Sequence, residues 1–293
     1  MLCWCPMIEP LLVGEPLLAE IASTAVLPGS LAAWRLGQAG FILKFPTAVI
    51  AIDPYLGNHC EAILGFPFDH RRLTRSPLDP AELDILDLLI CTHNHPDHLE
   101  APTVRALGRG NANASVVAPP ACRQELEGLG WSPSRIQSSV PGKPIVIGAL
   151  TVTGFAVPHE DFEDENGNPY QGFLISDGEV TVAHLGDLLD DIRVREILSA
   201  EPIDLLAVPI NGRDKTRSGM GFAGNLTAEE ATELAWHVGA VTTIPMHYDM
   251  FAQNVDLDAL ARFRVAAVSV NLTFQVAEVG EKILITRAAG RAE

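Results

Sequence analysis

The chain has 293 residues, of which 47% are apolar and 19% are charged, and this composition is typical of a globular protein. Its net charge of −17 argues against a nucleic-acid partner, because such a partner requires a basic face. No apolar run approaches the roughly 20 residues that are needed to cross a membrane. We therefore expect a soluble protein that acts on a small molecule, with no membrane and no nucleic acid as partner.

The cysteines and the N-terminus indicate the cellular compartment in which we expect the protein. The chain has five cysteines, Cys3, Cys5, Cys60, Cys91 and Cys122. An odd and irregularly spaced set does not form a disulfide framework. The N-terminus also lacks the basic residues that precede the apolar part of a secretion signal. Both observations favour a reducing, cytoplasmic setting, and the sequence leaves open whether the protein forms a homo-oligomer.

Residues 1–27 are expected to form an extension, with a helix near 16–22, that packs on the main domain. Residues 28–293 then form one domain of mixed strands and helices, because a domain of this size can bury a large core. Short apolar runs that end in polar turns predict its strands. These runs span 31–36, 40–45, 47–53, 85–90, 115–118, 144–147, 151–156, 179–183, 240–243 and 282–286. The clearest helix begins at Thr227, where Thr-Ala-Glu-Glu is a capping box.

Glycines and prolines between residues 56 and 80 predict a long loop without regular structure. The segment contains a cluster of basic and imidazole side chains, His59, His70, Arg71, Arg72 and Arg75. Long loops in compact domains are often functional. Two interpretations remain open for this segment: contact with the substrate over a binding site, and an ordinary solvated surface loop.

The most informative stretch is His93-Asn-His95-Pro-Asp97-His98, which carries three histidines and an aspartate within six residues. It follows the predicted strand 85–90, and ligands gather at the carboxyl ends of strands in layered α/β folds. Imidazole and carboxylate groups bind zinc and similar metals. Because one loop cannot easily bring all four groups to one ion, the stretch predicts two adjacent metal positions. The alternative is a histidine-rich surface loop, for which neither this spacing nor the preceding strand is needed.

This stretch is the His-x-His-x-Asp-His signature, and the sequence resembles the metallo-β-lactamase superfamily. Three more ligand-type residues follow predicted strands in the order of that family: His159, Asp187 in a Gly-Asp pair, and His247. The resemblance implies an α/β (α+β) fold, the four-layer αββα metallo-β-lactamase sandwich, whose two halves are related by an internal two-fold arrangement.

The resemblance also implies how the ligands divide between two divalent metal ions. One ion takes His93, His95 and His159, the other takes Asp97, His98 and His247, and Asp187 bridges them. Zinc (Zn2+) is the usual metal for such a ligand set, and manganese (Mn2+) is the alternative.

Several short stretches are similar to the L-ascorbate-6-phosphate lactonase branch of the superfamily. They span 27–30, 34–37, 207–213, 225–227 and 244–251. This similarity implies a metal-dependent hydrolase in which a metal-bridging hydroxide attacks a lactone or related ester of a small sugar acid, with or without a phosphate. Asp97 and Asp187 would be its catalytic residues, and Asp97 would orient the nucleophile or pass a proton to the leaving oxygen.

Three alternatives remain open at this point. A phosphodiesterase of the same fold could use both ions, because a metal pair can hold the two oxygens of an in-line displacement. A flavodiiron redox protein would carry Glu at the position of His95. A non-catalytic binding protein would have lost ligands, whereas this sequence retains all seven.

Five further residues are predicted to support the site or to bind the substrate. Asp53 ends a strand, where it either forms a turn or orients a ligand histidine. His184 is either a core histidine or a support for the metal ligands. Asn211, Arg213 and Tyr248 are predicted to contact the substrate. We expect an anionic small-molecule substrate, with Arg213 as its partner. A guanidinium binds phosphate or carboxylate, and an acidic chain needs such a basic group to bind an anion.

Overall fold

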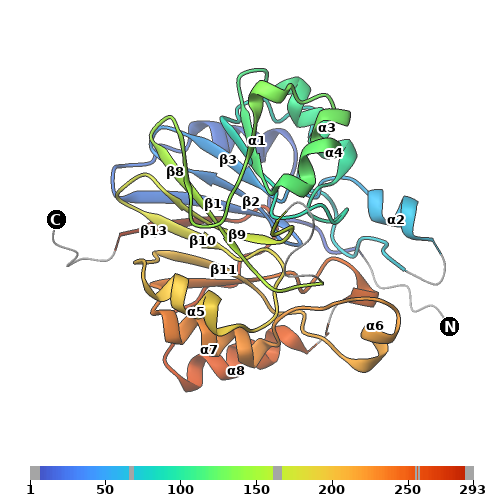
Figure 1. The fold of residues 1–293 in the computed structure, drawn as a ribbon, viewed down its shortest axis with the longest axis vertical. Helices are drawn as coiled ribbons and strands as arrows, with labels where there is room; N and C mark the ends of the chain where they lie inside the picture. Colours follow the sequence, from blue (N-terminus) through green and yellow to red (C-terminus); the bar gives the residue numbers. More distant parts are fainter. Residues whose placement is uncertain (1–6, 66–68, 161–166, 255, 257, 288–293) are drawn as a thin grey trace.

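The computed structural model describes residues 7–65, 69–160, 167–254, 256 and 258–287. Two β-sheets pack face to face around a shared core (Figure 1). One sheet has the strand order β13-β1-β2-β3-β4-β5-β6, and the other has the order β12-β11-β10-β9-β8-β7. The strands are β1 (Ser30–Gly37), β2 (Gly40–Lys44), β3 (Val49–Ile52), β4 (Leu88–Ile90), β5 (Ser115–Ala118), β6 (Ile136–Ser138), β7 (Pro144–Ile147), β8 (Leu150–Ala156), β9 (Gln171–Ser176), β10 (Thr181–His184), β11 (Leu205–Pro209), β12 (Thr242–Met246) and β13 (Lys282–Thr286).

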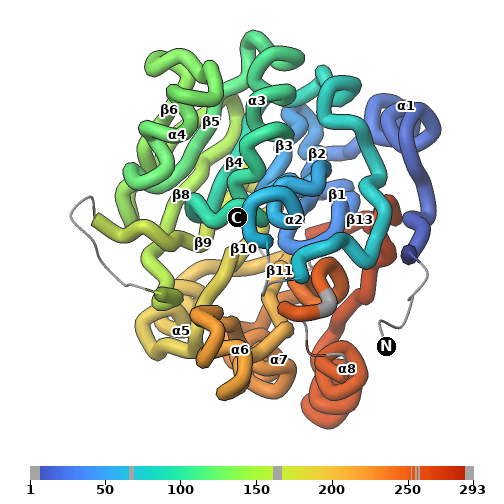
Figure 2. Tube along the Cα trace, turned by 90° about the vertical axis from the view of Figure 1, so that its right-hand side faces the viewer, coloured from blue at the N-terminus to red at the C-terminus, as the bar shows by residue number. Residues whose placement is uncertain are grey.

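Helices cover the outer face of each sheet (Figures 1 and 2). The first sheet is covered by α1 (Glu15–Ser23), α3 (Ala101–Gly110) and α4 (Arg123–Gly128), and the second by α5 (Ile192–Ser199), α7 (Ala228–Val238) and α8 (Ala259–Ser269). Shorter helices are α2 (His59–Leu64), α6 (Lys215–Gly219) and the 3-10 turns Pro120–Cys122, Pro133–Arg135 and Ala252–Asn254. This arrangement confirms the predicted four-layer αββα sandwich. No helix among the described residues is long and apolar enough to cross a membrane, and the cytoplasmic setting stays a prediction.

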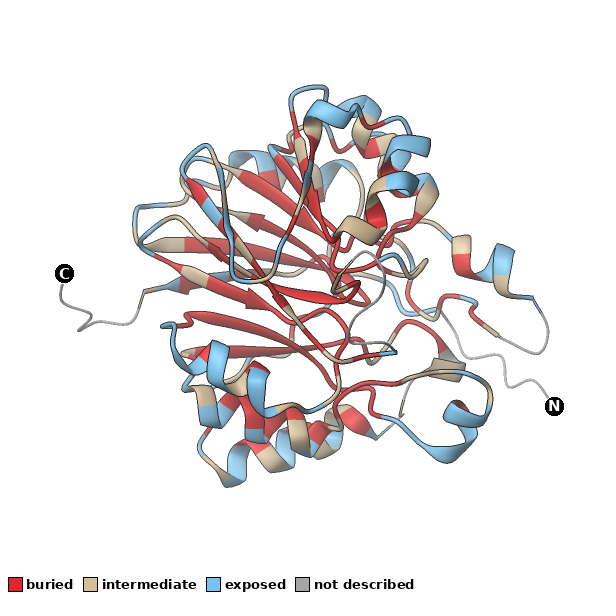
Figure 3. Cartoon of the chain, in the orientation of Figure 1, coloured by how far each residue is buried: buried red, intermediate tan, exposed pale blue. Residues whose placement is uncertain are grey.

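Strand β3 shows why the strands form nearly continuous apolar runs. Ile50 and Ile52 lie in the core between the two sheets, whereas Val49 and Ala51 lie in the core under the helices. Figure 3 shows the same pattern for the strands as a group, which are buried along most of their length. A strand that is covered on both faces has no solvent-facing side on which polar residues would be favoured.

The segment that precedes the first strand is attached to the domain through α1. Leu17 and Ile21 of this helix are fully buried in the core under the first sheet. The indole Nε1 of Trp34 donates a hydrogen bond of 2.8 Å to Glu20. The helix therefore packs on the domain, while a domain boundary between residues 27 and 28 stays a prediction. Cys3 and Cys5 lie outside the described residues.

The strand directions bring the candidate ligands to one edge of the sandwich. Strands β3 and β4 run parallel in one sheet, and β10, β11 and β12 run parallel in the other. Strand β8 has the direction of β10, because both are antiparallel to β9. Loops that follow parallel strands leave the sheet at the same edge. The loops after β4, β8, β10 and β12 carry His93, His159, Asp187 and His247.

The structure differs from the sequence-based expectations in several elements. Residues 56–80 are not free of regular structure, because α2 forms within them. Strand β12 begins two residues after the predicted start and extends to the residue before His247. Elements β6, β9, α5 and α8 were not predicted. In β9 the reason is Gly172, which weakens the apolar pattern of the strand but leaves space for the ring of Phe155.

Candidate metal centre

A buried aspartate holds the histidine loop in place. The two oxygens of Asp53 accept hydrogen bonds from the backbone N–H of Thr92 at 2.8 Å and from its hydroxyl at 2.6 Å. Asp53 Oδ2 also lies 2.7 Å from His98 Nδ1, which must be the donor because the carboxylate can only accept. His98 is thereby left with Nε2 facing the cluster. A carboxylate orients metal-binding histidines through this kind of contact.

The seven ligand-type side chains form two compact groups. One group contains His93, His95, His159 and Asp187, and the other contains Asp97, His98 and His247. Within each group the potential ligand atoms all lie within 4.8 Å of one another. The structure thus brings together every residue that the sequence predicts as a ligand, with the predicted division between two positions.

Asp187 faces both groups, one with each oxygen. Its Oδ1 lies 3.3 Å from His98 Nε2 and 3.3 Å from His247 Nε2, and its Oδ2 lies 3.6 Å from His159 Nε2. These distances exceed the roughly 2.7–2.9 Å of hydrogen bonds between charged groups. They match the spacing of about 3.4 Å between atoms that coordinate one ion tetrahedrally at about 2.1 Å. A carboxylate in this position can therefore bridge two ions.

The cluster contains buried polar atoms that the protein does not satisfy. Among the described residues, His93 Nε2, His98 Nε2 and Asp187 Oδ1 are buried without a hydrogen-bond partner. Such atoms are costly to bury unless something binds them. Burial lowers the pKa of His247, but Asp187 and Asp97 together raise it to about 9. Bound cations would satisfy the unpartnered atoms, so the residues present fit a metal site.

Gln38, in the turn between β1 and β2, was not identified from the sequence. Its buried side chain donates from Nε2 to Asp97 Oδ2 at 2.7 Å, and the same atom lies 2.9 Å from His247 Nε2. Its backbone oxygen accepts a 3.0 Å hydrogen bond from the N–H of His247. Gln38 thus fixes the positions of two candidate ligands. A glutamine in a turn belongs to no metal-binding motif, so only the fold reveals this role.

Tyr170, which directly precedes β9, supports the other group and was also missed. Its ring centroid lies 5.1 Å from those of His93 and His159, and 5.4 Å from that of His95. Its hydroxyl donates a 3.1 Å hydrogen bond to Glu160. The Glu160 carboxylate lies 3.5 Å from His95 Nε2, and this contact lowers the pKa of Glu160 to about 2. Glu160 is therefore negatively charged at neutral pH.

His184 tethers the loop that carries Asp187. Its Nε2 donates a 2.8 Å hydrogen bond to the carbonyl of Ala39, and its Nδ1 accepts one of 3.2 Å from the N–H of Gly186. Gly186 has a φ of 58°, and a Cβ at this position would lie 2.9 Å from the side chain of Thr92. Only glycine fits this close approach. Burial lowers the pKa of His184, so its imidazole is neutral. It positions Asp187 through its hydrogen bond with the neighbouring Gly186.

The backbone is strained where these side chains are held. Of the four non-glycine residues with positive φ in the described part of the chain, three lie in the cluster: Gln38 at 50°, Asp53 at 44° and His247 at 64°. Such conformations cost about 1–3 kcal/mol each and persist only where the surrounding structure imposes them. These three conformations therefore lower the stability of the fold, and they position side chains in and around the cluster.

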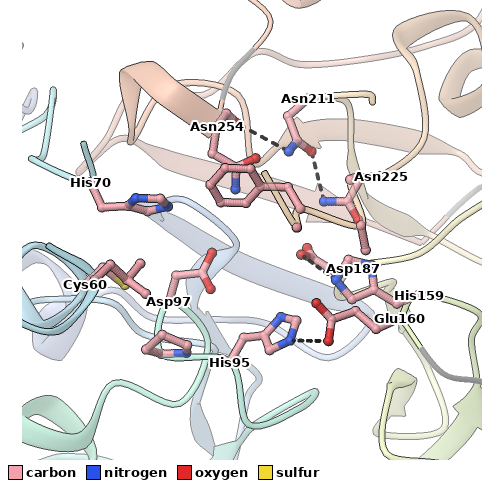
Figure 4. A pocket seen from close by; sticks show the side chains of 16 residues that line it. Cys60, His70, His95, Asp97, His159, Glu160, Asp187, Asn211, Asn225 and Asn254 are labelled. Atoms are coloured by element: carbon pink, nitrogen blue, oxygen red, sulfur yellow. Dashed lines mark hydrogen bonds and ion pairs between the residues drawn. The ribbon is translucent and has the colours of Figure 1, made fainter. Parts of the chain in front are cut away.

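A cavity of about 180 Å³ adjoins the cluster (Figure 4). The wall across from the candidate ligands contains Asn211, Asn225 and Asn254. Asn225 Nδ2 donates to Asn211 Oδ1 at 2.9 Å, and Asn211 Nδ2 donates to the carbonyl of Asn254 at 3.3 Å. The rings of His70 and Phe222, 5.5 Å apart, also line the cavity. The cavity therefore combines a metal-binding wall with a wall of amide and aromatic groups.

Comparison with known families is decisive for the superfamily. Residues 49–248 match the family model described as "Beta-lactamase superfamily domain". The chain belongs to the metallo-β-lactamase superfamily. The fold and the His/Asp cluster, which could hold metal ions, agree with this family.

Relatives and solved structures agree with this assignment. A "UPF0173 metal-dependent hydrolase" of Hyperthermus butylicus is 29% identical over 226 residues, which cover 74% of this chain and 82% of the relative. The fold is similar to that of Igni18, a metallo hydrolase of Ignicoccus hospitalis, with a TM-score of 0.65 and 19% identity. The match covers 87% of this chain and 98% of Igni18. The fold is also similar to that of an isothiocyanate hydrolase from Delia radicum gut bacteria, with a TM-score of 0.69 and 15% identity. This match covers 88% of this chain and 100% of that hydrolase.

In this member of the metallo-β-lactamase superfamily, two of the three predicted substrate contacts do not line the cavity. The guanidinium of Arg213 binds both oxygens of Glu230 at 2.7 Å. The ring of Tyr248 lies against Arg35, whose guanidinium carbon is 4.8 Å from the ring centroid. Asn211 alone of the three is a lining residue.

The basic residues of the segment 56–80 are also bound elsewhere. Arg72 is buried and donates to backbone carbonyls, and Arg71 forms an ion pair with Asp69. Other residues of this segment line the cavity instead, namely Cys60, Leu64 and His70. The segment therefore contributes apolar and imidazole groups to the cavity, and its arginines bind other partners.

Proposed function

We propose that the chain is a binuclear hydrolase in which Asp187 bridges two divalent metal ions. The observation that carries this proposal is the position of Asp187 Oδ1 among the candidate ligands of one group and of Oδ2 beside the other. The first ion would be held by His93, His95 and His159, and the second by Asp97, His98 and His247. When bound, the ions would act as Lewis acids and lower the pKa of a coordinated water from 15.7 to about 7. Zinc is favoured by the imidazole-rich set, with manganese as the alternative.

Residues of the chain would orient the attacking water. Asp97 lines the cavity, and although burial raises its pKa, His98 and His247 hold that pKa far below its usual range. An ionised carboxylate in this place can accept a hydrogen bond from the attacking water and orient it. Gln38 keeps Asp97 in position through its 2.7 Å hydrogen bond.

The substrate that we propose is a lactone or a related ester of a small molecule, attacked at its carbonyl carbon. The resemblance to the lactonase branch supports this choice, as does a cavity of about 180 Å³, which suits a small substrate. A phosphodiester is the second choice. It receives less support, because no lysine or arginine lines the cavity within the described residues.

A screen of the metal-reconstituted enzyme against matched panels of lactones and phosphodiesters tests this function. We expect lactone hydrolysis that is abolished by a chelator, restored by zinc or manganese, and lost in His95→Ala and Asp187→Ala. Turnover at the full rate in both variants would disprove the bimetal mechanism. Turnover of phosphodiesters without any turnover of lactones would favour the second choice.

A further inference from the structure

We propose that the part of the substrate away from the reacting carbonyl is small, uncharged and hydroxylated, and that the asparagine wall of the cavity recognises it. This inference rests on the proposed hydrolase function and specifies its substrate class. It departs from the expectation of an anionic substrate, which depended on a substrate-binding Arg213. The argument uses the charges around the cavity, the free hydrogen-bonding capacity of the wall, and the volume.

The charges that face the cavity are negative where they are not candidate metal ligands. Glu160 is a carboxylate that lines the cavity. Two arginines near the wall are bound to partners: Arg213 to Glu230, and Arg217 to Asp214 and to the backbone oxygen of Asn211. An anionic substituent in this place would lose water without gaining a cationic partner, and such desolvation is costly.

The asparagine wall is held by its own hydrogen bonds and contains a buried acceptor without a partner among the described residues. Asn225 Oδ1 accepts a 2.9 Å hydrogen bond from the N–H of Leu188, the residue after the bridging Asp187. The chain of hydrogen bonds then continues through Asn211 to the backbone of Asn254. Asn254 Oδ1 ends this chain as a buried atom without a hydrogen-bond partner among the described residues. A hydroxyl of the substrate would satisfy this oxygen, because a hydroxyl can donate.

The remaining lining groups and the volume limit the size of the substrate. The rings of His70 and Phe222 offer flat surfaces against which the carbon skeleton of a cyclic molecule can pack. The cavity, at about 180 Å³, is smaller than the roughly 300–1,000 Å³ of pockets that bind drug-sized ligands. A polyhydroxylated lactone with one ring is of suitable size for this cavity.

Four matched lactones test the inference with the metal-reconstituted full-length chain. They are a polyhydroxylated δ-lactone, its 6-carboxylate and 6-phosphate derivatives, and δ-valerolactone, which lacks the hydroxyls. We expect the value of kcat/KM for the uncharged hydroxylated lactone to exceed that of each charged derivative at least tenfold. We also expect Asn254→Ala to reduce its advantage over δ-valerolactone, while the exposed-site control Asn271→Ala leaves that advantage unchanged. Equal or faster turnover of a charged derivative would overturn the inference.

Binding measurements separate this inference from the proposed function. If none of the four lactones is hydrolysed, the ester chemistry of the proposed function fails. Hydrolysis-resistant lactams with the same substituents then still report recognition, through their dissociation constants in isothermal titration calorimetry. We expect the uncharged hydroxylated lactam to bind at least tenfold more tightly than the phosphorylated one, and to lose this preference in Asn254→Lys. Equal or tighter binding of the phosphorylated lactam by the unaltered protein would overturn the inference.

Discussion

Two carboxylates near His247, those of Asp249 and Asp187, lie at different distances from their charged or polar neighbours. Two residues further along the chain, Asp249 receives two hydrogen bonds of 2.6 and 2.7 Å from the buried guanidinium of Arg35. In the metal cluster, the carboxylate of Asp187 stays 3.3 Å or more from the imidazoles of His98 and His247. The first pair is in direct contact, whereas Asp187 is held apart from both imidazoles.

The difference separates residues that serve stability from residues that serve a ligand. A pair in direct contact satisfies its own hydrogen-bonding needs within the chain. Atoms that are held about 3.4 Å apart around a common point are satisfied only when an ion occupies that point. Substitutions in the two regions should therefore affect different measurements.

The largest effect is expected from Asp187→Asn. Loss of the bridging charge should reduce kcat/KM by about 10³-fold or more, as for other residues that act together in a catalytic unit. The rise in Tm on adding metal should also shrink, while the Tm of the metal-free protein changes less. A variant that retains both the full activity and the full metal-induced rise in Tm would contradict the bridging role.

The next largest effect is expected from Arg35→Ala, and it concerns stability. Removal of Arg35 leaves the partly buried carboxylate of Asp249 unpaired, so the loss should approach the roughly 3–5 kcal/mol that is typical of fully buried pairs. Urea unfolding of the metal-free protein should show this loss, and Arg35→Lys should show part of it. If the unfolding free energy of Arg35→Ala fell by less than about 1 kcal/mol, the pair would not have the structural importance that we assign to it.

Gln38→Gly should lower the activity while the unfolding free energy changes little. Loss of the amide that holds Asp97 and His247 should reduce kcat/KM by about 10- to 100-fold, as is usual for residues that orient metal ligands. The φ of 50° at this position suits glycine, so the unfolding free energy should change little. Gln38→Asn, with a shorter amide, serves as the comparison. Unchanged activity in Gln38→Gly would show that the hydrogen bond does not position Asp97.

The smallest effect is expected at the start of α7, in Glu230→Gln. Arg213 lowers the pKa of Glu230 from 4.5 to about 2, so the stabilisation is present above pH 4.5 and is lost as the pH falls towards 2. The variant should lose about 1 kcal/mol of stability at pH 7. The difference from the unaltered protein should disappear near pH 2. A difference that stays constant between pH 7 and pH 2 would contradict this origin, and hydrolysis at pH 7 should be unaffected.

The layers and the cluster of candidate metal ligands could be predicted because the sequence encodes them locally. The apolar runs of β5, β7 and β13 have the predicted bounds, since a short apolar run bounded by turn residues indicates a strand. The capping box at Thr227 is confirmed, because all its atoms come from four consecutive residues. The histidine loop is likewise a continuous stretch with fixed spacing.

Contacts between distant segments could not be predicted in this way. Gln38 and Tyr170 reach the cluster only because the sheets pack as they do, and neither belongs to a motif. Arg213 has the chemistry of an anion-binding residue, but Glu230, seventeen residues later, binds its guanidinium. The local sequence reveals which groups a residue carries, whereas the fold decides which partner each group meets.

Metal titration of the purified metal-free chain tests the central claim most directly. Isothermal titration calorimetry with zinc, and separately with manganese, should show two equivalents bound to the unaltered protein. Asp187→Ala should lose at least one of them, and the Arg35→Lys control should bind both. Binding of less than one equivalent of either metal by the unaltered protein, with no rise in Tm, would contradict a two-metal centre bridged by Asp187.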